Sequence, residues 1–201
     1  MKEIIVAVTG ASGAVYAQRL LHLLEESPEV RRVHLILTAY GLIVLREELD
    51  LDISGVKAAD VEALLGRPST KVQLHPAKDV GASIASGSYR TDGMVIIPCS
   101  MGSLGYIANG IARDLVHRAA DVTLKEHRKL ILVPRESPYN VIHLENMLKL
   151  QRAGAMIVPA SPGFYHRPTS IVELVDHFVY RILDHLDISH TADTIWQGRR
   201  T

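Results

Sequence analysis

The chain has 201 residues, of which 47% are hydrophobic and 22% are charged, and this is enough for one compact α/β domain with a full core. Its 22 lysines and arginines equal its 22 aspartates and glutamates, so the charge balance gives no reason to expect a nucleic-acid partner. The single cysteine, Cys99, excludes an intramolecular disulfide, and no histidine or cysteine spacing resembles a zinc site, so we expect no metal.

A predicted strand near residues 3–8 opens the chain. This apolar start is short and lacks a signal-peptide cleavage pattern, and no later run approaches the ~20 apolar residues of a membrane span. We therefore expect a cytoplasmic protein with no membrane partner.

The first strand runs into a glycine turn, Thr9-Gly10-Ala11-Ser12-Gly13-Ala14, and apolar residues at helical spacing follow over about 13–26. Small residues in such a turn let backbone amides and hydroxyls approach a phosphate, which the positive end of the helix favours. The first hypothesis is a nucleotide or a phosphorylated cofactor. The alternative is an ordinary strand-to-helix turn without a ligand, because glycine motifs are weak signals alone.

Two features of this region narrow the ligand. A P-loop needs Lys-Ser/Thr after its last glycine, and Ala14-Val15-Tyr16 stand there, which argues against NTP hydrolysis. A Rossmann dinucleotide site usually places Asp or Glu at the end of the second strand, whereas the predicted strand near 33–38 ends in Thr38. A small hydroxyl suits a lone phosphate better than a ribose diol, so a mononucleotide such as FMN fits better than NAD.

Further predicted strands lie near 94–98, 129–133 and 155–159, with a short candidate near 71–74. Predicted helices lie at about 39–47, 59–65, 102–127, 141–153 and 170–186, the one at 102–127 being broken near Gly110. This alternation indicates a doubly wound, mostly parallel, Rossmann-like or flavodoxin-like sheet in a single domain. We expect an FMN-binding domain over 1–186 and a C-terminal arm over 187–201 that lies on the surface or on a neighbour.

Ligands of open parallel sheets bind beyond the carboxyl ends of the strands. The segments expected at those ends carry small, polar or charged residues: Thr9–Ser12, Thr38, Pro98–Ser103, Pro134–Glu136 and Pro159–Gly163. We expect one crevice to hold them.

Arg118 and Lys125 lie seven residues apart on a predicted helix, and Arg135-Glu136 follows the next strand. Three cations and one carboxylate that meet there would suit a phosphate or diphosphate leaving group. The alternative is a solvated helix on which Asp121 pairs with Lys125 and with Arg118.

Other candidates carry weaker signals. Tyr165 lies in a turn-rich segment, where its phenol either binds a phosphate or pins the loop. Arg181 in the last amphipathic helix is typical of a surface residue. The patterns around His143 and His166 favour structural or surface roles over catalytic bases, and Cys99 is typical of a buried core thiol. We assign no Ser-His-Asp triad.

Over almost its whole length the chain resembles the flavin prenyltransferase family, the UbiX-like proteins formerly treated as decarboxylase subunits. The motifs that carry the resemblance are Thr9-Gly10-Ala11-Ser12-Gly13-Ala14, Ser86-Gly87-Ser88, Pro98-Cys99-Ser100, Arg118-Ala119-Ala120-Asp121-Val122, Lys125-Glu126, Pro134-Arg135-Glu136, His143-Leu144-Glu145-Asn146-Met147 and Pro162-Gly163-Phe164-Tyr165-His166.

This resemblance implies site residues of two kinds. FMN would be bound by Gly10, Ala11, Ser12, Thr38, Ser100, Met101, Gly102, Ser103 and Arg135. Dimethylallyl monophosphate would be bound by Tyr165, Arg181, Lys125 and Arg118, with Glu48 as a further acidic pocket position. The implied catalytic residues are Glu136, which would handle protons, and Lys125.

The implied reaction joins a dimethylallyl group to N5 and C6 of reduced FMN without a metal, while cations stabilise the departing phosphate. The product, prenylated FMN, would go to a partner decarboxylase. Many family members are homododecamers whose sites lie between subunits, which implies that the C-terminal arm with Trp196 covers a neighbour's pocket.

Two alternatives remain open. The FMN-dependent decarboxylases of C-terminal or phosphopantothenoyl cysteine share the fold and a helix matched by Ile107-Ala108-Asn109-Gly110, but their Pro-x-Met-Asn substrate clamp is absent. A non-enzymatic flavin carrier would need no cations beyond those that hold FMN.

Overall fold

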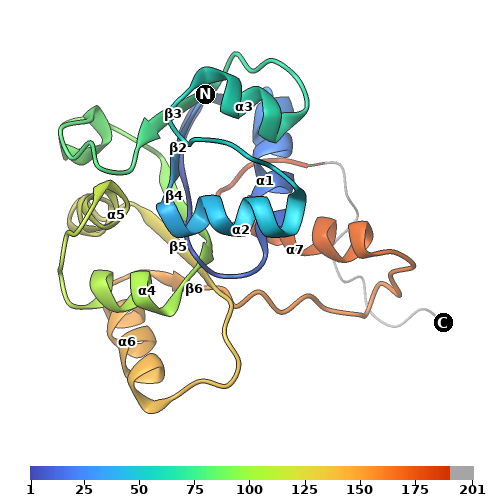
Figure 1. Ribbon diagram of the computed structural model, residues 1–201. Coiled ribbons are helices and arrows are strands. Elements are labelled where there is room, and N and C mark those ends of the chain that lie inside the picture. The colour runs from blue at the N-terminus through green and yellow to red at the C-terminus, as the bar shows by residue number, and fades with distance from the viewer. Residues whose placement is uncertain (191–201) are drawn as a thin grey trace.

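Six parallel strands form one sheet at the centre of the protein, shown in Figure 1 for a computed structural model that describes residues 1–190. They lie in the order β3-β2-β1-β4-β5-β6. Their bounds are β1 Lys2–Val8, β2 Val30–Leu37, β3 Val72–Pro76, β4 Gly93–Cys99, β5 Lys129–Pro134 and β6 Met156–Ile157. Every residue of β4 is buried, because helices cover both faces of the sheet and both sets of alternating side chains enter a core.

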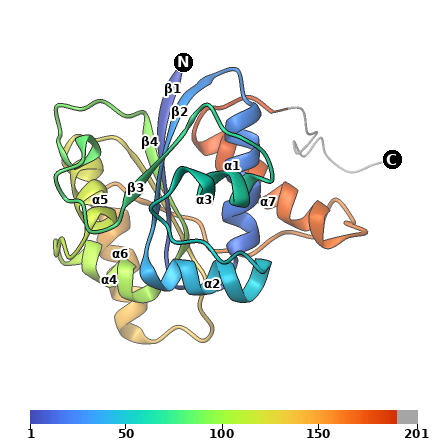
Figure 2. The same cartoon turned by 45° about the horizontal axis from the view of Figure 1, so that its top comes forward.

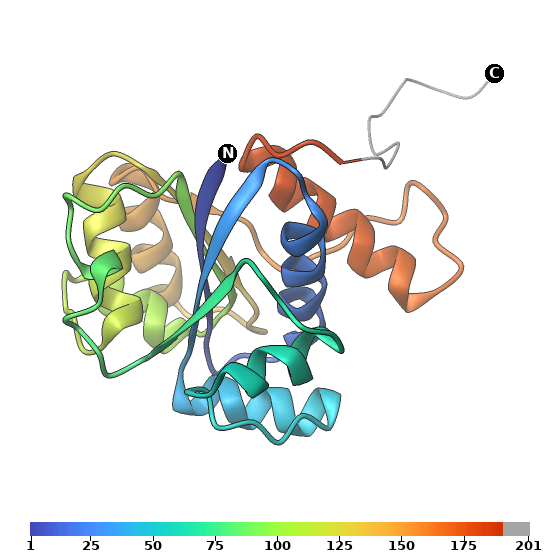
Figure 3. The same ribbon diagram turned by 90° about the horizontal axis from the view of Figure 1, so that it is seen from above.

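Two layers of helices enclose the sheet (Figure 3). Against one face pack α1 (Ala14–Glu26), α2 (Ala39–Leu49), α3 (Ala58–Leu65) and α7 (Ile171–His185). Against the other pack α4 (Met101–Ala108), α5 (Leu115–Lys125), α6 (Val141–Arg152) and the short 3-10 helix η1 (Ser83–Ala85). Along β1, Ile4 and Val6 enter the first core and Ile5 and Ala7 the second, which is the two-residue period of a buried strand.

The doubly wound sheet predicted from the sequence is confirmed, and the structure refines three of its elements. The short strand near 71–74 exists as β3, and β2 begins at Val30 rather than near 33. The predicted strand at 155–159 pairs with β5 over only two residues, Met156 and Ile157. Pro159 has no amide to donate, so pairing weakens there, although Val158 and Ala160 still donate to carbonyls of β5 residues.

The predicted long helix at 102–127 divides into α4 and α5. Asn109 ends α4, and its side-chain amide donates to the carbonyl of Gly105 at 2.8 Å. Gly110 follows with φ +66°, and the amide of Ile111 reaches back to the carbonyl of Tyr106 at 2.9 Å. This left-handed C-terminal cap ends the helix, and Asp114 starts the next one by accepting from the amide of His117.

The chain passes from β1 outward to β2 and β3 and then returns to the other side of β1 for β4, β5 and β6. The strand order therefore reverses between β1 and β4, and the carboxyl ends of these two strands are the expected ligand position of such a sheet.

Residues 187–190 follow α7 and lie at the amino edge of the sheet, where the strands begin, opposite their carboxyl ends. The ammonium of Lys2 donates to the carbonyl of Leu186 at 2.6 Å, and the amide of Ser189 donates to Glu29. The predicted arm extends over 187–201, so most of it, including Trp196, lies outside the described residues. Within residues 1–190, every helix is too short or too polar to cross a bilayer.

Candidate functional site

The carboxyl ends of β1 and β4 are held together by Thr9. Its hydroxyl donates to the carbonyl of Pro98 at 2.8 Å and accepts from the amide of Ser100 at 2.7 Å. The Thr9 side chain is buried, and the two bonds join the glycine turn to the segment that starts α4. The two predicted FMN segments therefore lie side by side at the reversal of strand order.

Two glycines bring α2 against the end of β1. A Cβ built on Gly10 would lie 2.4 Å from Cβ of Tyr40, and one built on Gly41 would lie 2.4 Å from the carbonyl oxygen of Val8. Neither distance is compatible with a side chain. The close approach lets Thr38 cap α2, because its hydroxyl accepts from the amide of Gly41 at 3.0 Å and donates to Val8.

Three helices begin at this edge, and their first-turn amides have no partner within the helix. Thr38 caps α2, and the Ser100 hydroxyl caps α4 by accepting from the amide of Ser103 at 3.2 Å. Gly13 precedes α1 with φ +119° and offers no side-chain cap. Amides and positive helix ends that converge in this way favour an anion such as phosphate.

Glu48 supplies the cap that α1 otherwise lacks. It lies near the end of α2, which runs along the carboxyl edge (Figure 3), and its carboxylate accepts from the amides of Gly13 at 2.9 Å and Ala14 at 2.8 Å. The resemblance implied only an acidic pocket position for Glu48. The structure shows how the residue reaches the turn, which the sequence could not, because α2 crosses the strands instead of running antiparallel to them.

Arg135 and Glu136 follow β5 at the same edge. Arg135 is exposed, whereas Glu136 is half-buried and accepts from the amide of Ser137 at 3.0 Å. The single chain therefore brings together the glycine turn, Thr38, the Ser100–Ser103 segment, Glu48 and Arg135-Glu136.

The single chain does not bring Arg118 and Lys125 to this group. Helix α5 returns antiparallel to the strands, so Lys125 at its end lies near the amino edge, and the six residues of β5 separate the two edges by roughly 16 Å. Arg118 donates to the carbonyl of Ala85 and pairs with Asp121 at 2.8 Å. The predicted Arg118–Asp121 pair is thus confirmed, while Lys125 pairs with Glu126 instead of Asp121.

Tyr165 and Arg181 lie on elements apart from both of these groups. Tyr165 is 84% exposed. It belongs to the loop over 158–170, which leaves the sheet after β6 and extends away from it to the start of α7 (Figures 1 and 2). Arg181 is exposed near the end of α7 and pairs with Asp184. The ring of His166 stacks on that of His177, with centroids 4.2 Å apart and an interplanar angle of 8°. No local pattern in the sequence indicates this stack.

Two weaker candidates have structural roles, as predicted. Cys99 is fully buried, and burial raises the pKa of its thiol to about 12, so it carries no thiolate at neutral pH. His143 sits in the first turn of α6, where it exchanges hydrogen bonds with the capping residue Asn140.

A buried polar cluster on strands β1, β2 and β3 was not anticipated from the sequence. His34 Nδ1 lies 2.9 Å from His75 Nε2, and His34 Nε2 lies 3.4 Å from a carboxylate oxygen of Glu3. Tyr89 donates to the same carboxylate at 2.8 Å, and Arg31 pairs with it. The cluster is buried within the sheet, and none of the predicted site residues belongs to it.

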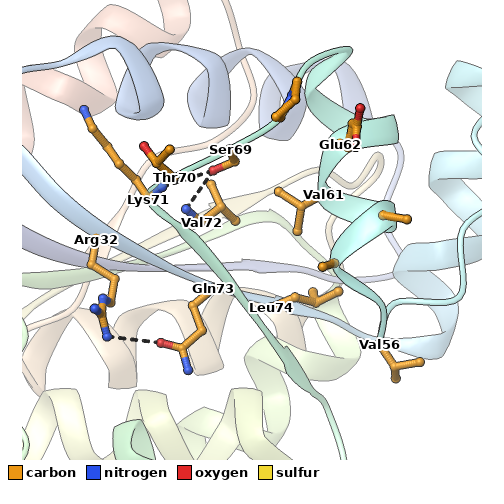
Figure 4. A pocket seen from close by; sticks show the side chains of 13 residues that line it. Arg32, Val56, Val61, Glu62, Ser69, Thr70, Lys71, Val72, Gln73 and Leu74 are labelled. Atoms are coloured by element: carbon orange, nitrogen blue, oxygen red, sulfur yellow. Dashed lines mark hydrogen bonds between the residues drawn. The ribbon is translucent and has the colours of Figure 1, made fainter.

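A groove of about 570 Å³ lies between α3 and the outer strand β3 (Figure 4). Arg32, Glu62, Lys71 and Gln73 contribute to its lining, and Arg32 donates to Gln73 at 3.4 Å. None of the predicted site residues lines it, so we place the candidate site at the carboxyl edge instead. Among residues 1–190, no group of three or more His, Cys, Asp or Glu side chains could hold a metal ion.

The family model named Flavoprotein matches residues 1–180. A flavin prenyltransferase UbiX of Alkalihalophilus pseudofirmus is 47% identical over 195 residues, which cover 97% of this chain and 96% of the relative. A solved structure of a dodecameric FMN-dependent UbiX-like decarboxylase from Escherichia coli O157:H7 has a TM-score of 0.85 at 44% identity, covering 98% of this chain and all of that one.

A structure of AnUbiX in complex with FMN and dimethylallyl pyrophosphate has a TM-score of 0.84 at 39% identity and covers 99% of each chain. The peptidyl-cysteine decarboxylase EpiD, at 15% identity, 89% coverage of this chain and 98% of that one, and a TM-score of 0.56, shares the fold alone. This chain therefore belongs to the Flavoprotein family, and within it to the flavin prenyltransferases.

Proposed function

We propose that this protein transfers a dimethylallyl group from dimethylallyl monophosphate to N5 and C6 of reduced FMN, and so makes prenylated FMN for a partner decarboxylase. The observation that carries the proposal is the convergence of the glycine turn, two further helix starts and Arg135-Glu136 at the reversal point of the sheet. It stands in a chain that matches a flavin prenyltransferase at 47% identity over nearly its full length.

The residues at the carboxyl edge fit a flavin mononucleotide. A Cβ on Gly102 would meet nothing within 4 Å, so the backbone at the start of α4 is open to a ligand. Gly10, Ala11, Ser12, Thr38, the Ser100–Ser103 segment and Arg135 would hold FMN, with amides and a guanidinium for its phosphate. When bound, reduced FMN supplies the nucleophilic N5 and C6 atoms to which the dimethylallyl group becomes joined.

The prenyl-phosphate residues would come from neighbouring copies. Lys125 lies toward the amino edge, and Arg118 is held by the carbonyl of Ala85 and by Asp121. Tyr165 and Arg181 lie on the loop over 158–170 and on α7, so one chain alone does not gather these four residues beside its own FMN segments. The solved relative from Escherichia coli is dodecameric, and a homododecamer of this chain would place amino-edge cations of one copy beside the carboxyl edge of another. Those cations would stabilise the phosphate as it departs.

Glu136 is the proposed proton acceptor. Its carboxylate is half-buried at the end of β5, beside the segment that would hold the flavin, and there it can take up the proton released from C6. Neighbouring copies that close the site would also exclude water, which would otherwise convert the prenyl group to an alcohol. A cytoplasmic location remains part of the proposal.

The cysteine-decarboxylase alternative has less support. The Ile107-Ala108-Asn109-Gly110 segment that suggested it is the C-terminal cap of α4, where the Asn109 side chain bonds to Gly105. That segment therefore has a structural explanation that requires no substrate.

Mass spectrometry under anaerobic conditions tests the proposal. Purified protein with reduced FMN and dimethylallyl monophosphate should yield a flavin heavier by one five-carbon unit. The Glu136→Gln variant should bind FMN as the parent does but form product far more slowly, because it lacks the proton acceptor. An unchanged flavin mass beside an active relative would refute the activity and leave the flavin-carrier alternative.

A further inference from the structure

Tyr165 and Arg181, the two proposed prenyl-phosphate ligands on this part of the chain, come from different elements. Tyr165 lies on the loop over 158–170, and Arg181 lies in the second half of α7. A phosphate can bind both side chains tightly only if the loop keeps a fixed position on the helix, because ordering a mobile loop on binding costs free energy.

The loop is anchored where it enters α7. The hydroxyl and the amide of Thr169 both donate to the Glu173 carboxylate, at 2.9 and 2.6 Å, and Ser170 caps the helix by accepting from the amide of Glu173. On its other side α7 is fixed to α1 by the pair between Arg19 and Asp176. These contacts fix the position of α7 and of the residues that enter it, but they do not reach the tip of the loop.

A ring contact joins the loop tip to α7. The imidazoles of His166 and His177 lie nearly parallel, with centroids 4.2 Å apart. Burial lowers the pKa of His177, and the positive charges of His166 and Arg181 add to the effect. A neutral His177 can stack on its partner without charge repulsion.

The same contact lies close to Tyr165 and on the helix face that carries Arg181. A Cβ on Gly163 would touch the Tyr165 ring at 3.5 Å and Cε1 of His177 at 3.9 Å, so these two rings flank one point of the loop backbone. His177 and Arg181 are four residues apart on α7 and therefore share a helix face. The stack thus links the tyrosine on the loop to the arginine on the helix.

We propose that His177 is a positioning residue whose stack with His166 holds Tyr165 beside Arg181, so that the phenol and the guanidinium form a preorganised cradle for the prenyl phosphate. This inference rests on the proposed function. The expected effect is roughly a three- to tenfold change in an equilibrium constant, equivalent to about 0.7–1.4 kcal/mol, which is the scale of one aromatic pair.

Two substitutions at one position test the stack. His177→Ala should raise KM for dimethylallyl monophosphate by about three- to tenfold, while kcat and the Kd for FMN stay unchanged. His177→Phe keeps a flat ring and should restore KM to within about twofold of the parent. A matched control is His22→Ala, which removes a half-buried histidine of α1 and should leave KM unchanged. An unchanged KM in His177→Ala, or no rescue by His177→Phe, would overturn the proposal.

Amide hydrogen exchange keeps the test independent of the activity. In the FMN-free protein, the segment 163–167 should exchange about three- to tenfold faster in His177→Ala than in the parent, and His177→Phe should return it to the parent rate. If the protein prenylates no flavin but the exchange changes as expected, the stack holds the loop and only the function is wrong. Equal exchange rates of this segment in the parent and in His177→Ala would contradict the positioning role, whatever the activity.

Discussion

Two glycines at the carboxyl edge have different roles. Gly10 is required by the packing of the fold, whereas Gly102 leaves space for the proposed ligand. A Cβ on Gly10 would lie 2.4 Å from Tyr40, within the packing between β1 and α2. A Cβ on Gly102 would meet no protein atom within 4 Å, although the residue lies in the first turn of α4, where the proposed phosphate approaches. Substitution by alanine should therefore have opposite consequences at the two positions.

Gly10→Ala should destabilise the protein by about 1–3 kcal/mol, because the added methyl group forces α2 away from the strand. Gly102→Ala should keep or raise the melting temperature, since alanine favours a helix, but should weaken FMN binding by roughly tenfold, equivalent to 1.4 kcal/mol. Thermal denaturation of the FMN-free protein and flavin fluorescence titration measure the two effects. A Gly102→Ala variant that loses stability but not FMN affinity would contradict this assignment.

At the residue scale, the sequence predicted which segments gather at the edge but not how their side chains are used. Thr9 and Thr38 were expected near a phosphate, and the structure shows that their hydroxyls join strand ends and cap α2. These bonds place backbone amides at the edge where the proposed ligand would bind. Such roles depend on contacts between residues distant in the chain, as in the 2.7 Å bond between Thr9 and Ser100, which no local pattern contains.

At the scale of elements, strands β1, β2 and β3 are joined by the buried cluster of Glu3, His34, His75 and Tyr89. Burial lowers the pKa of both histidines, that of His75 to about 4. Burial alone would raise the pKa of Glu3, but hydrogen bonds from Tyr89 and His34 hold it below its usual value. With both imidazoles neutral, His75 can donate to His34 and His34 to Glu3, which satisfies the three groups in a chain.

The protein should lose stability in mild acid through this cluster. In the unfolded chain His75 binds its proton near pH 6.5, but in the fold only near pH 4, so its contribution is complete above pH 6.5 and is lost as pH falls toward 4. Between pH 7 and 5 the loss should be on the order of 2 kcal/mol.

Urea unfolding at pH 7 and pH 5 measures this loss, and His75→Gln is the matched variant because it cannot titrate. The free energy of unfolding of His75→Gln should change less between the two pH values than that of the parent. Equal changes in both proteins would show that the cluster does not control the acid sensitivity.

The elements themselves were largely predictable, because buried parallel strands read as continuous apolar runs and glycine marks the break after α4. The position of α2 was not. Its apolar pattern predicts a helix, but only tertiary packing at Gly10 and Gly41 turns that helix along the sheet edge and carries Glu48 to the start of α1. The direction of α5 follows from the topology, and it explains why the predicted meeting of Lys125 with Glu136 does not occur within one chain.

At the scale of the whole molecule, the proposed site is divided among surfaces that one chain keeps apart. The proposed FMN-binding residues and Glu136 occupy the carboxyl edge, while Lys125 lies near the amino edge. Closed symmetric assemblies bring such different surfaces of identical subunits together. We therefore propose that Glu136 of one copy acts with Lys125 of another.

Subunit complementation tests this claim. Glu136→Gln and Lys125→Gln variants, each expected to be nearly inactive alone, are co-expressed with different affinity tags, and assemblies that carry both tags are purified. If the two residues act from different copies and the subunits mix randomly at equal amounts, about one quarter of the sites contain both native residues. As a control, the double variant mixed with native subunits should also retain about a quarter of native sites, against about half if both residues act within one chain.

The deciding measurement is the rate at which the doubly tagged assembly forms prenylated FMN. If the site is divided between copies, the rate should be about a quarter of the native rate, well above that of either variant alone. A doubly tagged assembly as inactive as the separate variants would mean that no site combines Glu136 of one copy with Lys125 of another, which would contradict the account.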